Sequence, residues 1–166
     1  MNRRTSLSRM AQTVLGLAVF SLSATAQAAS ELLKPKAAWK ALLPPANYAV
    51  LFEEDTERAG SSPLDHEKRA GTFVCFACAL PLFKSEFKYD SGTGWPSFYT
   101  ALPGAVQTRR DFKMVWPRTE YHCARCGGHQ GHRFDDGPQP TGQRYCNNGV
   151  ALRFIPSDQP LPALRT

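Results

Sequence analysis

The sequence has 166 residues, of which 42% are hydrophobic and 20% charged, the composition of one globular domain with a short appendage. Its formal net charge is +6, but three of those charges are Arg3, Arg4 and Arg9, in a segment with no acidic residue before Glu31. The other three are scattered among acids such as Glu53, without the basic stripe that phosphate backbones select. Composition and charge therefore argue against nucleic acid as a partner.

The first 28 residues have the pattern of a secretory signal peptide. Arginines precede an apolar run at 14–22, and Ala26-Gln27-Ala28 is a small-x-small cleavage pattern. The run is shorter than the roughly 20 residues of a spanning helix, so we expect no stable membrane insertion after cleavage. The sequence thus predicts export, to a bacterial periplasm. Residues 2–8 resemble a twin-arginine signal imperfectly, and the general secretory route stays open.

The chain after the signal is expected to form a helical lead-in, one domain and a tail. Residues rich in Ala, Lys and Leu favour a helix that Pro44-Pro45 ends. No repeat or second composition regime follows. The expected divisions are a signal peptide at 1–28, the lead-in at 29–45, the domain at 46–156 and the tail at 157–166.

Strand and turn signals alternate in the domain. β-branched and aromatic residues predict strands at 71–76, 112–116 and 150–155. Between them, residues 90–94 and 135–142 are rich in Gly, Pro and Asp, as tight turns require. Short strands separated by turns favour a mainly β, antiparallel fold in a single domain.

Four of the five cysteines form two CxxC pairs, Cys75-x-x-Cys78 and Cys123-x-x-Cys126. Each pair places two sulfurs on one side of a turn, and the two together complete a tetrahedral site, which strongly indicates structural zinc. Such a metal would join strands that are distant in sequence. Two alternatives remain: disulfides within each pair, and a local site formed by Cys123 and Cys126 with His129 and His132.

Cys146 is the unpaired cysteine, at a junction between a loop and a strand where nucleophiles often occur. Arg144 and two asparagines beside it could favour the thiolate, although a lone cysteine is as often a small buried hydrophobe. His129 and His132 lie among glycines, where either could donate a proton to a substrate or be a hydrogen-bonded structural residue.

These motifs, in this order and spacing, resemble those of the methionine-R-sulfoxide reductase B family over residues 48–155. The matching segments are Cys75-x-x-Cys78, Tyr89-Asp90-Ser91-Gly92-x-Gly94-Trp95-Pro96-Ser97-Phe98-Tyr99, Cys123-x-x-Cys126-Gly127, His129-x-Gly131-His132-x-Phe134-Asp135-Asp136-Gly137-Pro138 and Arg144-Tyr145-Cys146. The resemblance implies two antiparallel sheets, a Cys₄ zinc site, and an oxidoreductase that repairs methionine (R)-sulfoxide in proteins under oxidative stress.

The resemblance also assigns roles to individual residues. Cys146 would be the nucleophile, with His132 and His129 near the sulfoxide oxygen, and Asn148 and Arg144 organising the thiolate. Trp95 would pack on the substrate methyl group, since sulfur and aromatic rings attract; its alternative is a core residue. The implied partners are oxidised protein or peptide substrates, and the chain is expected to be a monomer.

Two positions depart from the family pattern. Thr93 occupies the place of the recycling cysteine that many members carry, so an external thiol such as a thioredoxin-like protein is expected to reduce Cys146 sulfenic acid. Asn147 replaces a commonly apolar residue. The rival hypotheses are a zinc-stabilised binding module and a catalytically idle relative, for both of which Cys146→Ser would change no activity.

Overall fold

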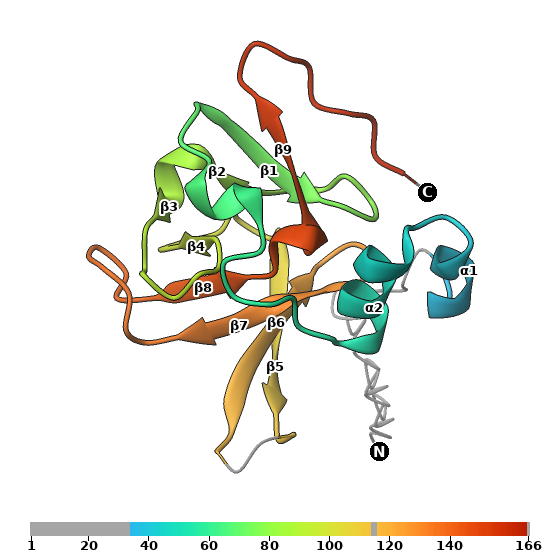
Figure 1. Ribbon diagram of the computed structural model, residues 1–166, viewed down its shortest axis with the longest axis horizontal. Coiled ribbons are helices and arrows are strands. Elements are labelled where there is room, and N and C mark those ends of the chain that lie inside the picture. The colour runs from blue at the N-terminus through green and yellow to red at the C-terminus, as the bar shows by residue number, and fades with distance from the viewer. Residues whose placement is uncertain (1–33, 114–115, 166) are drawn as a thin grey trace, which may run out of the picture.

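The computed structural model describes residues 34–113 and 116–165 (Figure 1). The predicted signal peptide and the first residues of the lead-in lie outside these ranges. The two α-helices are α1 (Lys36–Lys40) and α2 (Pro45–Glu53), and three 3₁₀ helices cover Pro63–His66, Ser85–Phe87 and Gly149–Ala151. The described strands are β1 (Gly71–Cys75), β2 (Pro81–Lys84), β3 (Lys88–Tyr89), β4 (Ser97–Phe98), β5 (Val106–Asp111), β6 (Arg118–Cys123), β7 (His129–Phe134), β8 (Arg144–Asn147) and β9 (Leu152–Pro156).

The strands form two sheets in which every neighbouring pair is antiparallel. The smaller sheet has the order β2-β1-β9, and the larger has the order β3-β4-β8-β7-β6-β5. The expected mainly β fold of two antiparallel sheets is therefore confirmed. In Figure 1 the β5–β6 hairpin projects from the body at the edge of the larger sheet.

Aromatic side chains join the two sheets. Phe83 of β2 stacks on Phe98 of β4 with ring centroids 4.1 Å apart, and Phe73 of β1 meets Phe98 edge-on at 5.0 Å. All three side chains are fully buried. Aromatic residues favour strands because a pleated, half-buried surface accommodates them, and these contacts fix the smaller sheet against the larger one.

Pro44-Pro45 begins a helix and does not end the one before it, because α1 already ends at Lys40. Pro45 is the first residue of α2, where a fixed φ and a missing N–H are compatible with a helix start. The two helices contact each other through Trp39 and Phe52, whose rings stack at 5.8 Å, and α2 packs against β7. No helix in the described part of the chain is both long and apolar enough to span a membrane.

The prediction of a strand at residues 112–116 is wrong. Phe112 and Trp116 are both exposed and belong to the connection between β5 and β6. Aromatic content alone suggested a strand there, whereas the actual strands on either side are polar and are held by their register with each other. The strand expected at 150–155 is present but begins at Leu152, after the 3₁₀ helix Gly149–Ala151.

Candidate active site and metal centre

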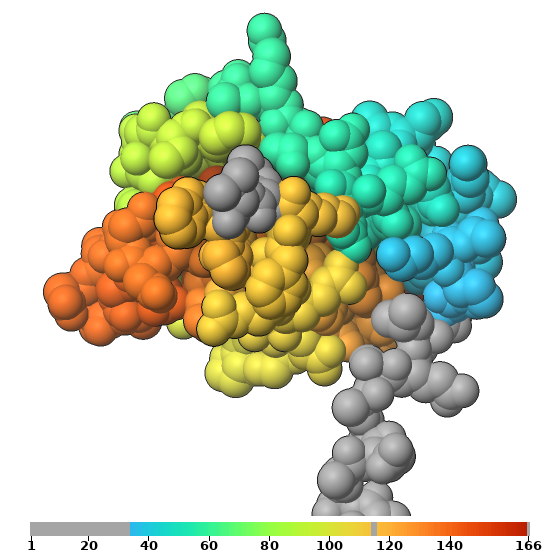
Figure 2. Space-filling view, turned by 90° about the horizontal axis from the view of Figure 1, so that it is seen from below, coloured from blue at the N-terminus to red at the C-terminus, as the bar shows by residue number. Residues whose placement is uncertain are grey.

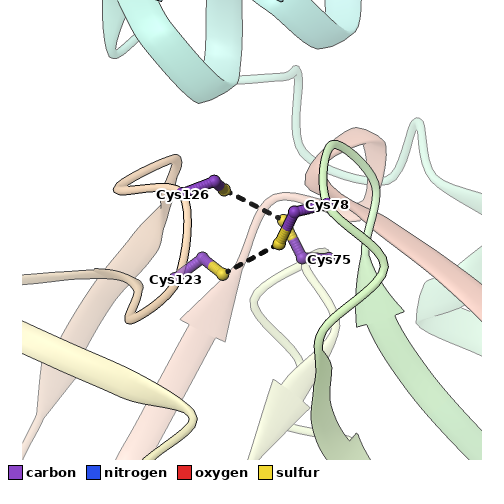
Figure 3. Close-up of side chains that lie close together, drawn as sticks. All are labelled: Cys75, Cys78, Cys123 and Cys126. Atoms are coloured by element: carbon purple, nitrogen blue, oxygen red, sulfur yellow. Dashed lines mark hydrogen bonds between the residues drawn. The ribbon is translucent and has the colours of Figure 1, made fainter. Parts of the chain in front are cut away.

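The two CxxC pairs meet at one buried cluster (Figure 3). The contacts run between the pairs: the sulfurs of Cys75 and Cys126 are 3.6 Å apart, and those of Cys78 and Cys123 are 3.5 Å apart. All four sulfurs lie within 4.8 Å of one another. A tetrahedral ZnS₄ site with bonds of about 2.3 Å has sulfur–sulfur edges of about 3.8 Å, so the cluster fits a metal ion of this kind.

Two turns of the same geometry build this cluster. In the first, Ala79 N–H donates to Cys75 O at 2.9 Å, and in the second Gly127 N–H donates to Cys123 O at 2.9 Å. Both donors have positive φ, 63° at Ala79 and 69° at Gly127. The left-handed residue ends each turn and lets both sulfurs of a pair face the same side, which makes the four residues a structural metal centre.

Neither alternative for the cysteines is found. All five cysteines are free thiols, so neither CxxC pair is a disulfide. His129 and His132 do not complete a local site with the second pair, because each ring bonds to a carboxylate instead.

A row of facing residues crosses the larger sheet and contains Cys146. Residues directly opposite each other on neighbouring strands project from the same face. In this row Cys146 of β8 pairs with His132 of β7, His132 pairs with Glu120 of β6, and Glu120 pairs with Arg109 of β5. On the other side of Cys146, Ser97 of β4 is its partner. The nucleophile candidate and one predicted histidine are therefore adjacent by strand register.

A β-bulge brings the second histidine to the same face. Residues three apart in a regular strand face opposite sides, which would separate His129 from His132. The register shifts opposite Tyr121/His122, and Gln130 is the extra residue on β7. A bulge of this kind redirects the following side chains. As a result both histidine rings lie on one face, with centroids 5.4 Å apart.

Each histidine bonds to a buried or half-buried carboxylate. His132 Nε2 lies 2.8 Å from Asp111 Oδ2, and His129 Nδ1 lies 2.8 Å from Glu120 Oε1. Burial lowers the pKa of His132, while the bond to Asp111 opposes that shift. Burial alone would raise the pKa of Glu120, but the bond and charge of His129 and the charge of Arg109 outweigh it and lower that pKa. Both carboxylates are thus ionised partners that orient an imidazole ring.

A cavity of about 140 Å³ opens beside Cys146. Its lining residues are Thr56, Trp95, Arg118, Gly131, His132, Phe134, Cys146, Asn147 and Asn148. Trp95 is half-buried and donates its indole N–H to Glu57 O at 3.1 Å, so it is a wall of this cavity and not a core residue. His129 lines a neighbouring groove, so only His132 of the two histidines borders the cavity that contains Cys146.

Asn148 and Arg144 reach the site in different ways. Asn148 lines the cavity and is fixed by its Nδ2, which donates to Gln130 O at 3.1 Å. Arg144 is paired with Asp136 through two hydrogen bonds of 2.8 Å and stacks on Phe134 at 4.3 Å. Arg144 acts on Cys146 chiefly by its charge.

Arg144 favours the Cys146 thiolate, as expected, but burial outweighs it. Burial raises the pKa of the Cys146 thiol above its ordinary value. The positive charge of Arg144 and hydrogen bonds from Thr93 and Arg144 oppose the shift, and the nearby Asp136 carboxylate adds to it. Arg144 and Asp136 form a pair, so the guanidinium charge is partly neutralised and burial prevails.

Comparison with known proteins identifies a family for this chain. Residues 43–156 match the SelR domain. The chain is 48% identical over 127 residues to the peptide methionine sulfoxide reductase MsrB of Bradyrhizobium diazoefficiens, covering 76% of this chain and 91% of that protein. This chain belongs to the methionine-R-sulfoxide reductase B family.

Further relatives of the family are similar over the same region. The peptide methionine sulfoxide reductase MsrB of Pseudomonas putida is 50% identical over 121 residues, covering 72% of this chain and 91% of that protein. The mitochondrial methionine-R-sulfoxide reductase B3 of Mus musculus is 46% identical over 117 residues, which are 70% of this chain and 46% of that protein.

The family motifs did not reveal Glu57, which supports two walls of the cavity. Its backbone O accepts from Trp95 Nε1, and its N–H donates to Asn148 Oδ1 at 3.1 Å. Its carboxylate accepts from the backbone N–H groups of Gly149 and Val150, the latter at 3.1 Å. Glu57 supports the site only through contacts with residues that are distant in sequence. A single Glu in a polar loop gives no sequence signal for such contacts.

The two departures from the reductase family pattern have distinct surroundings. Thr93 lies in the site, where its Oγ1 is 2.8 Å from Ser91 Oγ and its hydrogen bond lowers the pKa of Cys146. Asn147 is fully buried, and its Oδ1 accepts from Tyr121 Oη at 2.7 Å. The first position therefore keeps a polar contact to Cys146, and the second is part of a hydrogen-bonded polar network next to it.

Proposed function

We propose that this protein reduces methionine (R)-sulfoxide in peptides and proteins, with Cys146 as the nucleophile. The observation that carries the proposal is the register of β7 and β8, which places His132 opposite Cys146 in a cavity of about 140 Å³ walled by Trp95. Family membership supports the same reaction, and a binding module without catalysis is not favoured.

In the first step the Cys146 thiolate attacks the sulfoxide sulfur while the sulfoxide oxygen takes up a proton. This attack forms a bond between the Cys146 sulfur and the substrate sulfur, and the protonated oxygen takes a second proton and leaves as water. A water molecule then attacks the Cys146 sulfur and loses a proton, the sulfur–sulfur bond breaks, methionine leaves with the electron pair, and Cys146 is left as a sulfenic acid. His132 is the proton donor, because it faces Cys146 and Asp111 holds its ring; burial lowers the pKa of His132, so its protonated form gives up the proton readily. His129 supports it from the same face, and Arg144 and Asn148 hold the thiolate side of the site.

The methyl group of the substrate packs on the indole of Trp95. This ring lies in the cavity with Cys146 and is fixed by its bond to Glu57 O. Contacts between sulfur and aromatic rings contribute about 0.3 to 1.5 kcal/mol. The wall therefore holds the sulfoxide sulfur toward the nucleophile.

An external dithiol or two thiols return Cys146 to its reduced form. One thiol forms a mixed disulfide with Cys146 and releases water, and the second displaces it, giving a disulfide and the Cys146 thiol. The other four cysteines all belong to the metal cluster, and the threonine at position 93 has no redox chemistry. A thioredoxin-like protein fits this role.

Zinc is the metal we propose for the Cys₄ centre, because four buried thiolates at tetrahedral spacing are its preferred structural site. We further propose that residues 1–28 direct the chain to the periplasm, where the mature protein acts as a monomer. Metallation before export would protect the four thiols from oxidation.

The test is reduction of two peptides that differ only in the sulfoxide epimer, with dithiothreitol as reductant. Wild type should form methionine from the R epimer alone, and Cys146→Ser should form none while keeping its metal, because Cys146 lies outside the cluster. Metal content measured before and after substrate should not change. A metal-loaded wild type that reduces neither epimer would establish the binding module instead.

A further inference from the structure

A second groove continues from the methionine cavity along the same face. It has a volume of about 430 Å³ and shares Thr56, Arg118 and His132 with the cavity. Phe112 and Lys113 of the β5–β6 connection also line it. Figure 2 shows the β5–β6 hairpin, in yellow to light orange, beside the chain at the end of α2, in teal. A polypeptide whose oxidised methionine fills the cavity could extend along this groove.

The charged side chains of the groove lie at two depths below the surface. Arg109 pairs with Glu120 and Glu54, and Lys113 pairs with Glu54. The side chains of Arg109 and Lys113 are 53% and 61% exposed, whereas those of Glu54 and Glu120 are 22% and 3% exposed. The cations form the outer rim and the carboxylates lie beneath them. An approaching chain therefore meets positive charge first.

The C-terminus of α2 sets this arrangement. Glu54 follows the last residue of the helix in a left-handed conformation, with φ of 60°. That conformation is uncommon for a residue with a side chain and is maintained where other contacts compensate. Here the N–H groups of Glu54 and Asp55 close the helix end by donating to Ala49 O, and the Glu54 carboxylate accepts bonds from Arg109 and Lys113 at the groove.

We propose that this groove binds an acidic side chain near the oxidised methionine of a protein substrate. The proposal rests on the reductase function proposed above and names the class of sequence that the enzyme prefers. The partner is an extended, locally unfolded polypeptide, because only such a segment can place its methionine in the cavity and its neighbours along the groove. The rim of Arg109 and Lys113 is complementary to its carboxylate.

The strand register gives the spacing. Cys146, His132, Glu120 and Arg109 lie on four successive strands, so three interstrand steps of about 4.8 Å separate the nucleophile from the rim, a distance of about 14 Å. An extended peptide advances about 3.3 Å per residue. The side chains of the methionine and of the acidic residue cover part of this distance. The preferred acidic residue therefore lies about two to four positions from the methionine.

The test compares peptides of a neutral Gly/Ser host with one methionine (R)-sulfoxide, in which Glu or Gln is placed at each of four positions on either side. At low salt, wild type should show a kcat/KM about threefold higher for Glu than for Gln at one or two of these positions, the size expected of exposed ion pairs. The preference should fade as salt rises toward 0.5 M.

Two variants locate the effect. Lys113→Gln should lower the ratio of kcat/KM for the Glu peptide to kcat/KM for the Gln peptide toward one. Lys84→Gln is the matched control, since Lys84 is 54% exposed and also forms a surface ion pair, with Glu86 on a different part of the chain. Equal rates for Glu and Gln peptides in wild type, or a preference that survives Lys113→Gln, would overturn the proposal. Failure to reduce any of the peptides would instead count against the reductase function.

Discussion

The polar pair beneath the nucleophile offers a sharp test of the site's packing. Asn147 Oδ1 accepts from Tyr121 Oη at 2.7 Å, and Asn147 Nδ2 donates to Asn148 O at 2.7 Å. Both side chains are fully buried, and burial raises the pKa of Tyr121 well above its ordinary value, so the phenol is a neutral donor. We expect Asn147→Leu to destabilise the protein even though leucine is the more hydrophobic residue.

The magnitude follows from the groups left without partners. Asn147→Leu leaves the buried Tyr121 hydroxyl unpaired, which costs about 1 to 3 kcal/mol. Tyr121→Phe leaves Asn147 Oδ1 unpaired and costs a similar amount. The double variant removes both ends of the bond, so its cost should be smaller than the sum by about 1 to 2 kcal/mol.

The assay is equilibrium denaturation of the four proteins in their metal-loaded form, with the free energies combined in a double-mutant cycle. A thermal scan should show the Asn147→Leu midpoint falling by several degrees, because about 1 kcal/mol corresponds to about 3 to 5 °C in a domain of this size. The reasoning fails if Asn147→Leu is neutral, or if the two substitutions are additive, since either result means that the buried bond contributes nothing.

The remaining predictions concern the metal centre and Cys146. Cys126→Ser should lose bound zinc and lower the thermal midpoint, and metal analysis with a thermal scan checks both; the Cys146→Ser protein, with its metal intact, is the comparison. The rate with wild type should rise with pH, because burial raises the pKa of Cys146 and the thiolate is the reactive form. Asp136→Asn should shift that rise to lower pH by removing a charge that disfavours the thiolate, whereas Asp135→Asn, whose carboxylate bonds Gln143, should not.

The sequence predicted the metal centre well because its information is local. Each CxxC pair lies in a single turn, and the same i to i+4 backbone bond closes both turns. Once two such turns are present in one domain, the fold has only to bring them together. It places Cys75, at the end of β1, next to Cys126, which precedes β7. The loop-to-strand junction predicted for Cys146 is wrong in detail, because Cys146 lies within the short strand β8, Arg144–Asn147.

The supports of the site could not be predicted in the same way. β5 is a strand of polar residues, and no hydrophobic alternation marks it. Asp111 at the end of β5 reaches His132 of β7 only because the fold places both strands on either side of β6 in one sheet. Glu57 acts through bonds to residues more than thirty positions away. Such roles depend on topology, which the residue pattern around these positions does not contain.

The bulge residue Gln130 connects the metal centre with the active face. Its Nε2 donates to Cys75 Sγ at 3.6 Å, and its backbone O accepts from both the N–H and the side chain of Asn148, at 2.8 and 3.1 Å. The same bulge turns His129 and His132 to one face. A metal that fixes the Cys75 sulfur therefore also holds the residue on which the histidine geometry depends. Loss of the metal should therefore disturb the histidine geometry as well as the fold.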